Sequence, residues 1–200
     1  MDRLIIFAFA TLLGALWLLT KWSDEVTRGP GVLVRGSPIQ ENHRKKTPPM
    51  IMGNWRLEPV ASYQIEARVL EVEEYDSSEI DELVPLDFLL GWGPMSDSGL
   101  IEKLELGISG RYATWRYWGE APASTRTISE HASNHHLVPA DTQVRELLEG
   151  VRVGHIVILR GELVNIHSKA GDEFFRSSLT RTDSGPGACE VMLVRSVSVR

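Results

Sequence analysis

Residues 4–20 (LIIFAFATLLGALWLLT) constrain the fold more than any other stretch, because none of these seventeen residues carries a charge. A helix rises about 1.5 Å per residue, so the run covers roughly 25 Å, near the thickness of the hydrocarbon core of a bilayer. Trp17, Lys21 and Trp22 lie at its far end and are residue types that favour the membrane interface. The run from Leu4 to Thr20 therefore predicts a transmembrane helix.

A cleaved signal peptide is the alternative interpretation, since Arg3 provides the positive charge that usually precedes one. However, the apolar run is longer than a usual signal core, and residues 16–22 (LWLLTKW) contain no small-residue cleavage site. We therefore expect residues 1–22 to be the uncleaved signal anchor of a single-pass membrane protein. Basic residues flank both ends, so charge leaves the orientation open. The short N-terminal tail favours a domain on the side of the membrane away from the cytoplasm.

Charge divides the remaining chain into two parts. Residues 21–56 contain seven basic and three acidic residues, whereas residues 57–200 contain thirteen basic and twenty-three acidic ones. Repeated Pro and Gly residues predict a basic linker over 23–56, followed by an acidic globular domain over 57–200. A net charge of −10 on that domain argues against a nucleic-acid partner, which needs a positive surface. The single cysteine, Cys189, excludes an internal disulfide and a zinc site built on cysteine pairs.

Hydrophobic periodicity predicts an α+β fold for the domain. Alternating or β-branched stretches predict strands over residues 63–75, 111–118, 155–167, 173–182 and 189–199. Capped apolar stripes predict helices over 97–106 and 141–151, residues 81–91 suggest a short helix or buried turn, and residues 127–140 suggest an irregular segment. We expect a curled antiparallel sheet with two or three short helices. Five strands and a bend at Gly161 also allow a small OB-like barrel. The eight carboxylates in residues 71–87 are typical of a solvated rim.

A histidine-rich segment and the lone cysteine are the candidates for catalysis, namely His131, Asn134, His136 and Cys189. A nucleophilic thiolate needs a neighbouring histidine or positive charge to lower its pKa, and His131 or His136 could supply it. The alternative is a loop whose histidines bond to the backbone, with Cys189 a small buried residue. Zinc catalysis needs three protein ligands, and no HExxH-type spacing is present. We therefore predict no metal and no cofactor.

The strand RYATWRYW (residues 111–118) interleaves aromatic and basic residues, as a stacking platform for bases or sugars does. On a strand, Trp115 and Tyr117 share one face with Arg111, and packing in the core is the alternative role for these aromatic rings. Together with residues in two other loop-like stretches, they form the set of binding candidates: Trp92, Asp97, Trp115, Tyr117, Arg181 and Asp183.

Three stretches together carry a family resemblance: GWGPMSD (91–97), HASNHHLVPA (131–140) and SSLTRTDSGPGACE (177–190). They resemble a set of uncharacterised bacterial membrane-anchored proteins with GWGxMSD, HxxNxHLxPA and SSLTRxDxGxGACE motifs, for which no activity is known. The resemblance implies a bacterial origin, and with it we expect the domain on the periplasmic side of the inner membrane. Because the three stretches lie between regular elements, where sites tend to form, we also expect them to converge in space.

Three classes of function follow from these observations. The first is a membrane-anchored envelope protein whose acidic domain binds a protein, peptide or cell-wall partner such as peptidoglycan. The alternative is a hydrolase or transferase that uses Cys189 with His136 or His131, and a nucleic-acid-binding OB-like module is the third possibility. Convergence of the candidate side chains in a cleft would distinguish the enzyme from the binding protein.

Overall fold

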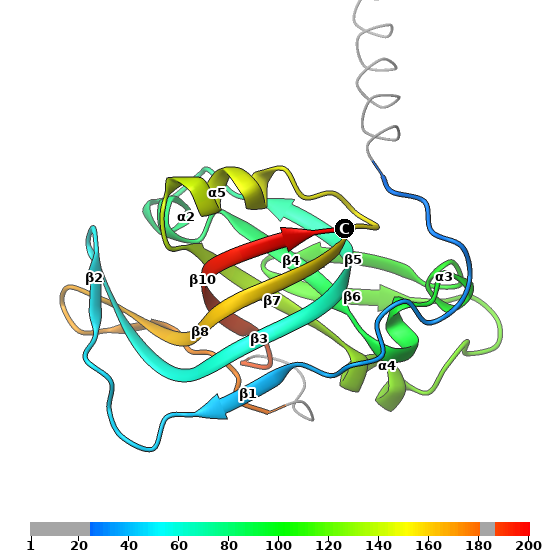
Figure 1. The fold of residues 1–200 in the computed structure, drawn as a ribbon, viewed down its shortest axis with the longest axis horizontal. Helices are drawn as coiled ribbons and strands as arrows, with labels where there is room; N and C mark the ends of the chain where they lie inside the picture. Colours follow the sequence, from blue (N-terminus) through cyan, green and yellow to red (C-terminus); the bar gives the residue numbers. More distant parts are fainter. Residues whose placement is uncertain (1–24, 181–186) are drawn as a thin grey trace, which may run out of the picture.

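The computed structural model of this protein describes residues 25–180 and 187–200 (Figure 1). The predicted transmembrane helix at residues 4–20 lies outside them. Within the described ranges, no helix combines the length and the apolar character that crossing a membrane requires. The described domain is α+β with a strand-rich curled sheet, as the periodicity predicted, but it has four short helices rather than two or three.

The longest strand, β3 (Trp55–Glu74), is the element on which the sheet is built. Its inward-facing residues alternate along the strand as the sequence predicted, and Tyr63, Ile65 and Val69 are all buried. Most of β3 pairs antiparallel with β8 (Ile156–Ser168), and its last residues pair with β4 (Leu86–Gly91). One strand therefore joins the two ends of the curled sheet.

The sheet closes into a ring of five strands. β4 pairs antiparallel with β7 (Ala132–Pro139), β7 pairs parallel with β10 (Glu190–Val199), and β10 pairs antiparallel with β8. The pairing of β8 with β3 completes the ring, and the main hydrophobic core fills its interior. At Gly161 a Cβ atom would lie 1.9 Å from the carbonyl oxygen of Leu193, so the close approach of β8 and β10 requires glycine.

Two helices join strands of the ring. α5 (Thr142–Glu149) connects β7 to β8 and begins at Asp141, whose carboxylate accepts a 2.8 Å hydrogen bond from the backbone N–H of Val144. This helix agrees with the one predicted over residues 141–151. α2 (Glu79–Leu83) connects β3 to β4, and β9 (Glu173–Phe175) extends the sheet beyond β8.

The connection from β4 to β7 is long and covers the outside of the barrel. It contains η1 (Gly93–Ser96), α3 (Ser98–Ile101), the hairpin β5 (Glu105–Ser109) and β6 (Tyr112–Arg116), and α4 (Thr125–His131). The hairpin forms a two-stranded sheet of its own. A second apolar cluster, which includes Leu70, Leu89, Met95 and Ile128, fills the space between this connection and the barrel.

Four of the predicted elements differ from the structure, and one of them is the strand expected over residues 173–182, of which only β9 forms among the described residues. Residues 81–91 form the strand β4 after a short helix, residues 127–140 form α4 and β7, and the predicted helix over 97–106 ends at Ile101. All six residues of β4 are buried, because the barrel core covers one face and the β4–β7 connection covers the other. A strand that is buried on both faces shows no alternation in its sequence.

The described part of the expected linker lies along the barrel. β1 (Ile39–Asn42) and β2 (Met50–Met52) both pair with β3. Val34 is buried in the core, and its backbone bonds to Ser96 and Gly93. Val26 donates a 2.9 Å hydrogen bond to the carbonyl oxygen of Val153, so the chain contacts the domain soon after residue 25.

Candidate functional site

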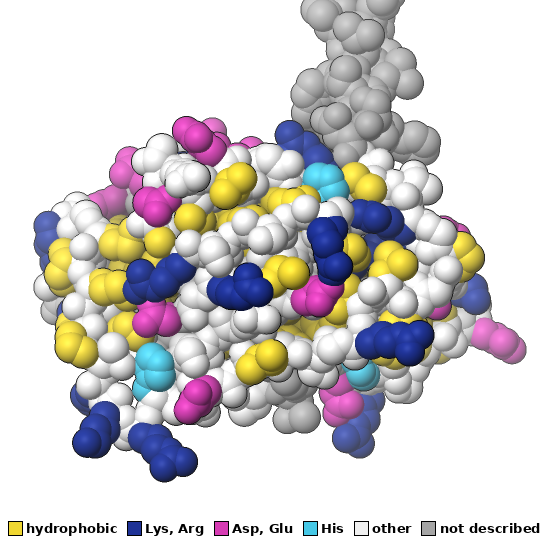
Figure 2. All heavy atoms as spheres, in the orientation of Figure 1, with side chains coloured by type: hydrophobic (Ala, Val, Ile, Leu, Met, Phe, Trp, Pro, Cys, Tyr) yellow, Lys and Arg dark blue, Asp and Glu magenta, His cyan; other side chains and the backbone are white. Residues whose placement is uncertain are grey.

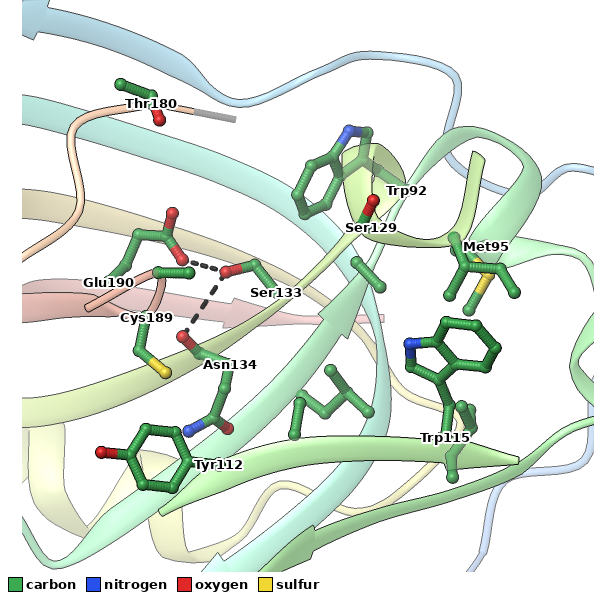
Figure 3. A pocket seen from close by; sticks show the side chains of 16 residues that line it. Trp92, Met95, Tyr112, Trp115, Ser129, Ser133, Asn134, Thr180, Cys189 and Glu190 are labelled. Carbon is green, nitrogen blue, oxygen red and sulfur yellow. Dashed lines mark hydrogen bonds between the residues drawn. The ribbon is translucent and has the colours of Figure 1, made fainter. Parts of the chain in front are cut away.

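A pocket of about 450 Å³ lies between the outside of the barrel and the β5–β6 hairpin (Figure 3). All three stretches of the family resemblance line it, which confirms the prediction that they converge. Trp92 and Met95 come from the first stretch and Asn134 from the second, while Cys189 and Glu190 come from the third. The walls are mostly apolar, and the polar groups gather where β7 and β10 begin.

The tip of the hairpin has an unusual backbone conformation. Gly110 and Arg111 form its two-residue loop, with φ angles of +56° and +67°. Two positive φ angles are typical of a type I′ turn, whose twist matches that of the flanking strands. Among the described residues, Arg111 is the one non-glycine residue with positive φ. A conformation that disfavours a side chain suggests that contacts of the arginine hold it there.

The Arg111 guanidinium reaches from the hairpin to two carboxylates on the barrel side. It pairs with Asp81 on α2 and, at 3.1 Å, with Asp87 on β4. It also donates to the carbonyl oxygen of Val84 at 3.0 Å and lies 3.8 Å from the centre of the Tyr75 ring. Both carboxylates are buried and the guanidinium is mostly buried. These ion pairs are therefore largely desolvated, and they hold the hairpin against the barrel.

Asp87 is the centre of this network and is fully buried. Besides the guanidinium, its carboxylate accepts hydrogen bonds from His136 Nδ1 at 2.9 Å, from Asn134 Nδ2 at 3.0 Å and from the Tyr75 hydroxyl at 3.4 Å. Asp87 and His136 face each other across β4 and β7. The expectation of a solvated acidic rim is therefore wrong for Asp81 and Asp87, because distant donors compensate their burial.

The network perturbs two pKa values. Burial, followed by the nearby negative charge of Asp87, raises the pKa of Tyr75 well above its usual range. Burial alone would raise the pKa of Asp81. However, hydrogen bonds from Ser78 and Arg111, together with the guanidinium charge, outweigh burial and lower the pKa of Asp81 below its ordinary value. Tyr75 is therefore neutral and Asp81 ionised at neutral pH.

Asn134 connects the network to the pocket. Its amide nitrogen donates to Asp87 and, at 3.0 Å, to the carbonyl oxygen of Arg111. Its oxygen Oδ1 is buried and makes no hydrogen bond within the part of the chain that the structure describes. In Figure 3 the amide nitrogen lies on the side of Tyr112, and Oδ1 lies on the opposite side. The neighbouring Ser133 hydroxyl donates to the carboxylate of Glu190.

The candidate catalytic residues are only partly brought together. Asn134 and His136 meet at Asp87, and the Cys189 thiol lies 3.8 Å from the Arg111 carbonyl oxygen that Asn134 also contacts. The His136 ring packs against Phe175, with centroids 5.0 Å apart. His136 does not contribute to the pocket lining, whereas Cys189 does.

The other histidines of the segment have structural partners. His131 ends α4, where its Nδ1 lies 2.9 Å from the carbonyl oxygen of Thr127. This is the backbone hydrogen bond that the alternative interpretation expected. His135 is completely buried, 3.1 Å from the Tyr63 hydroxyl. In the described residues, no group of three His, Cys, Asp or Glu side chains is placed to hold a metal ion.

The candidate binding residues fall into three groups. Trp92 and Trp115 line the pocket, and Tyr117 stacks beside Trp115 with centroids 6.2 Å apart and an interplanar angle of 13°. The prediction that Trp115 and Tyr117 share a face is therefore confirmed. Asp97 instead caps α3, because its carboxylate accepts from the backbone N–H groups of Gly31 and Gly99. Arg181 and Asp183 lie outside the described residues.

Sequence reasoning missed the residues that hold the site together. Asp87 is the single charge in the apolar run LDFLLG, and a lone charge in a strand buried on both faces signals a buried partner. Arg111 was noted only as part of the aromatic strand, and its φ angle and carboxylate partners have no local signature. Comparison with protein-family models, with curated proteins and with solved structures finds no match to this chain.

Proposed function

We propose that this protein is a membrane-anchored binding domain that holds a partner of the bacterial cell envelope through the pocket under the β5–β6 hairpin. The pocket carries the proposal. At about 450 Å³, with mostly apolar walls and a few polar groups at one end, it has the size and composition of sites that take a small molecule or a side chain. The predicted anchor at residues 4–20 would place it at the periplasmic surface of the inner membrane.

We also propose that the barrel is OB-like. Five strands in a ring, a strand order that departs from the chain order, and α5 between the third and fourth ring strands support this description. Proteins with such barrels bind ligands beside the barrel strands or in the adjoining loops. Here the long β4–β7 connection supplies one wall of the pocket.

The charge distribution argues against the nucleic-acid alternative. On the face in Figure 2, basic and acidic side chains are interspersed. Arg195 pairs with Glu162 at 2.6 Å, and Arg200 pairs with Glu66. Arginines that are paired with carboxylates offer little net attraction to a phosphate backbone, which requires unpaired positive charge.

The hydrolase or transferase alternative draws its support from Cys189, which lines the pocket next to Asn134. Against it, His136 does not line the pocket and its ring packs against Phe175, while the His131 ring nitrogen is bonded to the backbone. The rate of alkylation by iodoacetamide against pH separates the two proposals. A midpoint near the ordinary thiol pKa of about 8.5 favours the binding domain, whereas a strongly lowered midpoint favours the enzyme.

The binding proposal can be tested on the full chain in lipid nanodiscs, labelled with 5-fluorotryptophan. The probes are N-acetyl amides of leucine, phenylalanine, tyrosine and tryptophan. We expect at least one of them to shift the fluorine resonances of Trp92 and Trp115, which line the pocket, and to leave that of Trp55 unchanged. If none of the probes shifts either pocket resonance, the proposal fails.

Two variants of the same strand provide a matched comparison. Ala113 lines the pocket, whereas the neighbouring Thr114 bonds to the carbonyl oxygen of Gly107 and does not. Both side chains are exposed, so a larger ring at either position should leave the core intact. We expect Ala113→Phe to abolish the probe shifts and Thr114→Phe to retain them. A reporter fused after Arg200 tests the periplasmic location separately.

A further inference from the structure

The C-terminal part of β3 is paired along one edge. β3 pairs with β8 along most of its length and with β4 over residues 68–74. On the β8 side, the backbone hydrogen bonds reach as far as Val69, which accepts from the N–H of Gly154 and donates to the carbonyl oxygen of His155, both at 2.8 Å. In the part of the chain that the structure describes, no strand pairs with this edge over residues 70–74.

The register with β4 shows which backbone groups face that open edge. The N–H of Tyr75 donates to the carbonyl oxygen of Pro85 at 2.8 Å, so these two residues form a hydrogen-bonded pair at the end of the ladder. In an antiparallel ladder, such pairs alternate with pairs whose backbone groups point away from each other. Val72 and Glu74 belong to the second kind, because each lies an odd number of residues from Tyr75. Their N–H and C=O groups therefore point to the open edge.

A groove of about 790 Å³ lies at this edge. Residues 68–74 of β3 line it together with residues 151–153, which precede β8, and with the apolar side chains of Ile101, Leu104 and Leu106. The side chain of Val72 is half-buried, and those of Glu73 and Glu74 are exposed. The edge is therefore accessible from solvent and has apolar walls beside it.

Carboxylates outnumber basic groups in the groove. The charged residues of its described lining are four glutamates and two arginines, namely Glu25, Glu71, Glu73, Glu74, Arg68 and Arg152. Both arginines donate to oxygen atoms of the chain itself. Arg68 bonds to the Ser98 hydroxyl at 2.7 Å, and Arg152 bonds to the carbonyl oxygen of Glu149 at 2.6 Å. The open edge therefore lies beside an excess of negative charge.

This charge decides which chain could add to the edge. Charged side chains on an edge strand discourage pairing with other copies of the same protein. A second copy that paired through this edge would bring its own glutamates against those at positions 71, 73 and 74, and like charges placed opposite each other are destabilising. A basic segment would meet the opposite charge, and such complementarity provides specificity.

We propose that this groove binds an extended, basic segment of a partner protein by adding it as a strand to β3. The backbone of the segment bonds to Val72 and Glu74, its apolar side chains contact the walls of the groove, and its lysine or arginine side chains pair with the glutamates. Of the described residues that line this groove and the pocket under the hairpin, Leu106 alone is common to both. The inference therefore concerns a second site and goes beyond the proposed function.

The test uses a fluorescein-labelled heptapeptide of alternating lysine and valine. Fluorescence anisotropy measures its binding to the full chain in phosphatidylcholine nanodiscs, with empty nanodiscs as the blank. We expect the same peptide with glutamate in place of lysine to bind at least about tenfold more weakly. N-methylation of the valines removes the N–H groups from one edge of the peptide, and N-methylation of the lysines removes them from the other edge. One of these two peptides should bind about tenfold more weakly than the parent, and the other should bind as the parent does.

Two double variants provide a matched comparison. Glu73→Lys with Glu74→Lys reverses two exposed charges in the groove, whereas Glu120→Lys with Glu173→Lys makes the same change at exposed positions outside its lining. We expect the first pair to weaken binding of the lysine peptide about tenfold and the second to leave it unchanged. No binding of the lysine peptide, equal effects of the two methylations, or equal effects of the two double variants would each overturn the proposal. The fluorine resonances of the pocket do not enter this measurement, so either proposal can fail alone.

Discussion

Arg111 offers the sharpest test of how the pocket is held together. Replacing it with alanine removes both ion pairs and leaves the carboxylates of Asp81 and Asp87 buried without their counter-ion. Removing one partner of a buried ion pair destabilises a protein by about 3–5 kcal/mol. The remaining donors, which include His136 and Asn134, still bond to Asp87, so we expect the domain to fold.

Two further substitutions make the prediction specific to the arginine side chain. Arg111→Lys keeps the charge, but one ammonium group cannot reach both carboxylates and the Val84 carbonyl oxygen. We therefore expect its loss of stability to lie between zero and that of the alanine variant. Arg111→Gly loses the same contacts as alanine but removes the strain of a side chain at φ +67°. That strain is about 1 kcal/mol, so glycine should be less destabilising than alanine by this amount.

Thermal unfolding of the full chain in nanodiscs, followed by near-ultraviolet circular dichroism, measures these differences. For a domain of this size each kcal/mol lowers the Tm by about 2–4 °C, so the alanine variant should unfold about 6–20 °C below the wild type. The reasoning is refuted if alanine lowers the Tm by less than about 3 °C, or if glycine is worse than alanine. The second result would mean that the φ angle is not strained.

Three further predictions follow from individual contacts. Gly161→Ala should destabilise the barrel by at least about 2 kcal/mol in urea unfolding, because its Cβ would lie 1.9 Å from the Leu193 carbonyl oxygen; a neutral result would contradict the close approach. The pKa of Asp81 is lowered in the folded state, so its contribution to stability is present above the unfolded value of about 3.9 and is lost as pH falls through the folded value. Asp81→Asn should therefore be less stable than wild type at pH 7. In urea unfolding, the difference in unfolding free energy between the two should become smaller towards pH 2. The pKa of Tyr75 is raised, so its contribution is present below about pH 10 and is lost as pH rises through the folded value. In a titration followed at 295 nm we expect the ionisation that Tyr75→Phe removes to lie above the ordinary tyrosine range, and in Tyr75→Phe the alkaline unfolding midpoint should rise.

The elements that the sequence predicted well are those with one buried face or a local cap. β3 alternates because one side faces the core, and α5 begins at a carboxylate that bonds to its first turn. Gly161 was predicted to mark a bend because it lies inside an apolar strand, and the structure shows a close approach of β8 and β10 at that position. Each of these signals lies within a few residues of the feature that it predicts.

The candidate site was predicted in its location but not in its construction. The three loop-like stretches converge as expected, and Trp92, Asn134 and Cys189 all line the pocket. The network around Asp87 was missed, because its donors come from residues 12 to 49 positions away in the chain. Such pairings leave no periodicity in the sequence.

Periodicity and composition alone therefore determined the apolar N-terminal run, the acidic strand-rich domain and the strands with one exposed face. Only the tertiary structure decided that β4 and most of β7 are buried on both faces, since the β4–β7 connection covers the outside of β4 and α2 packs near Val138 of β7. It also decided which polar residues are buried. A carboxylate or an amide can leave water only where other segments bring donors to it, and for Asp87 and Asn134 those segments are the hairpin tip and the neighbouring strand.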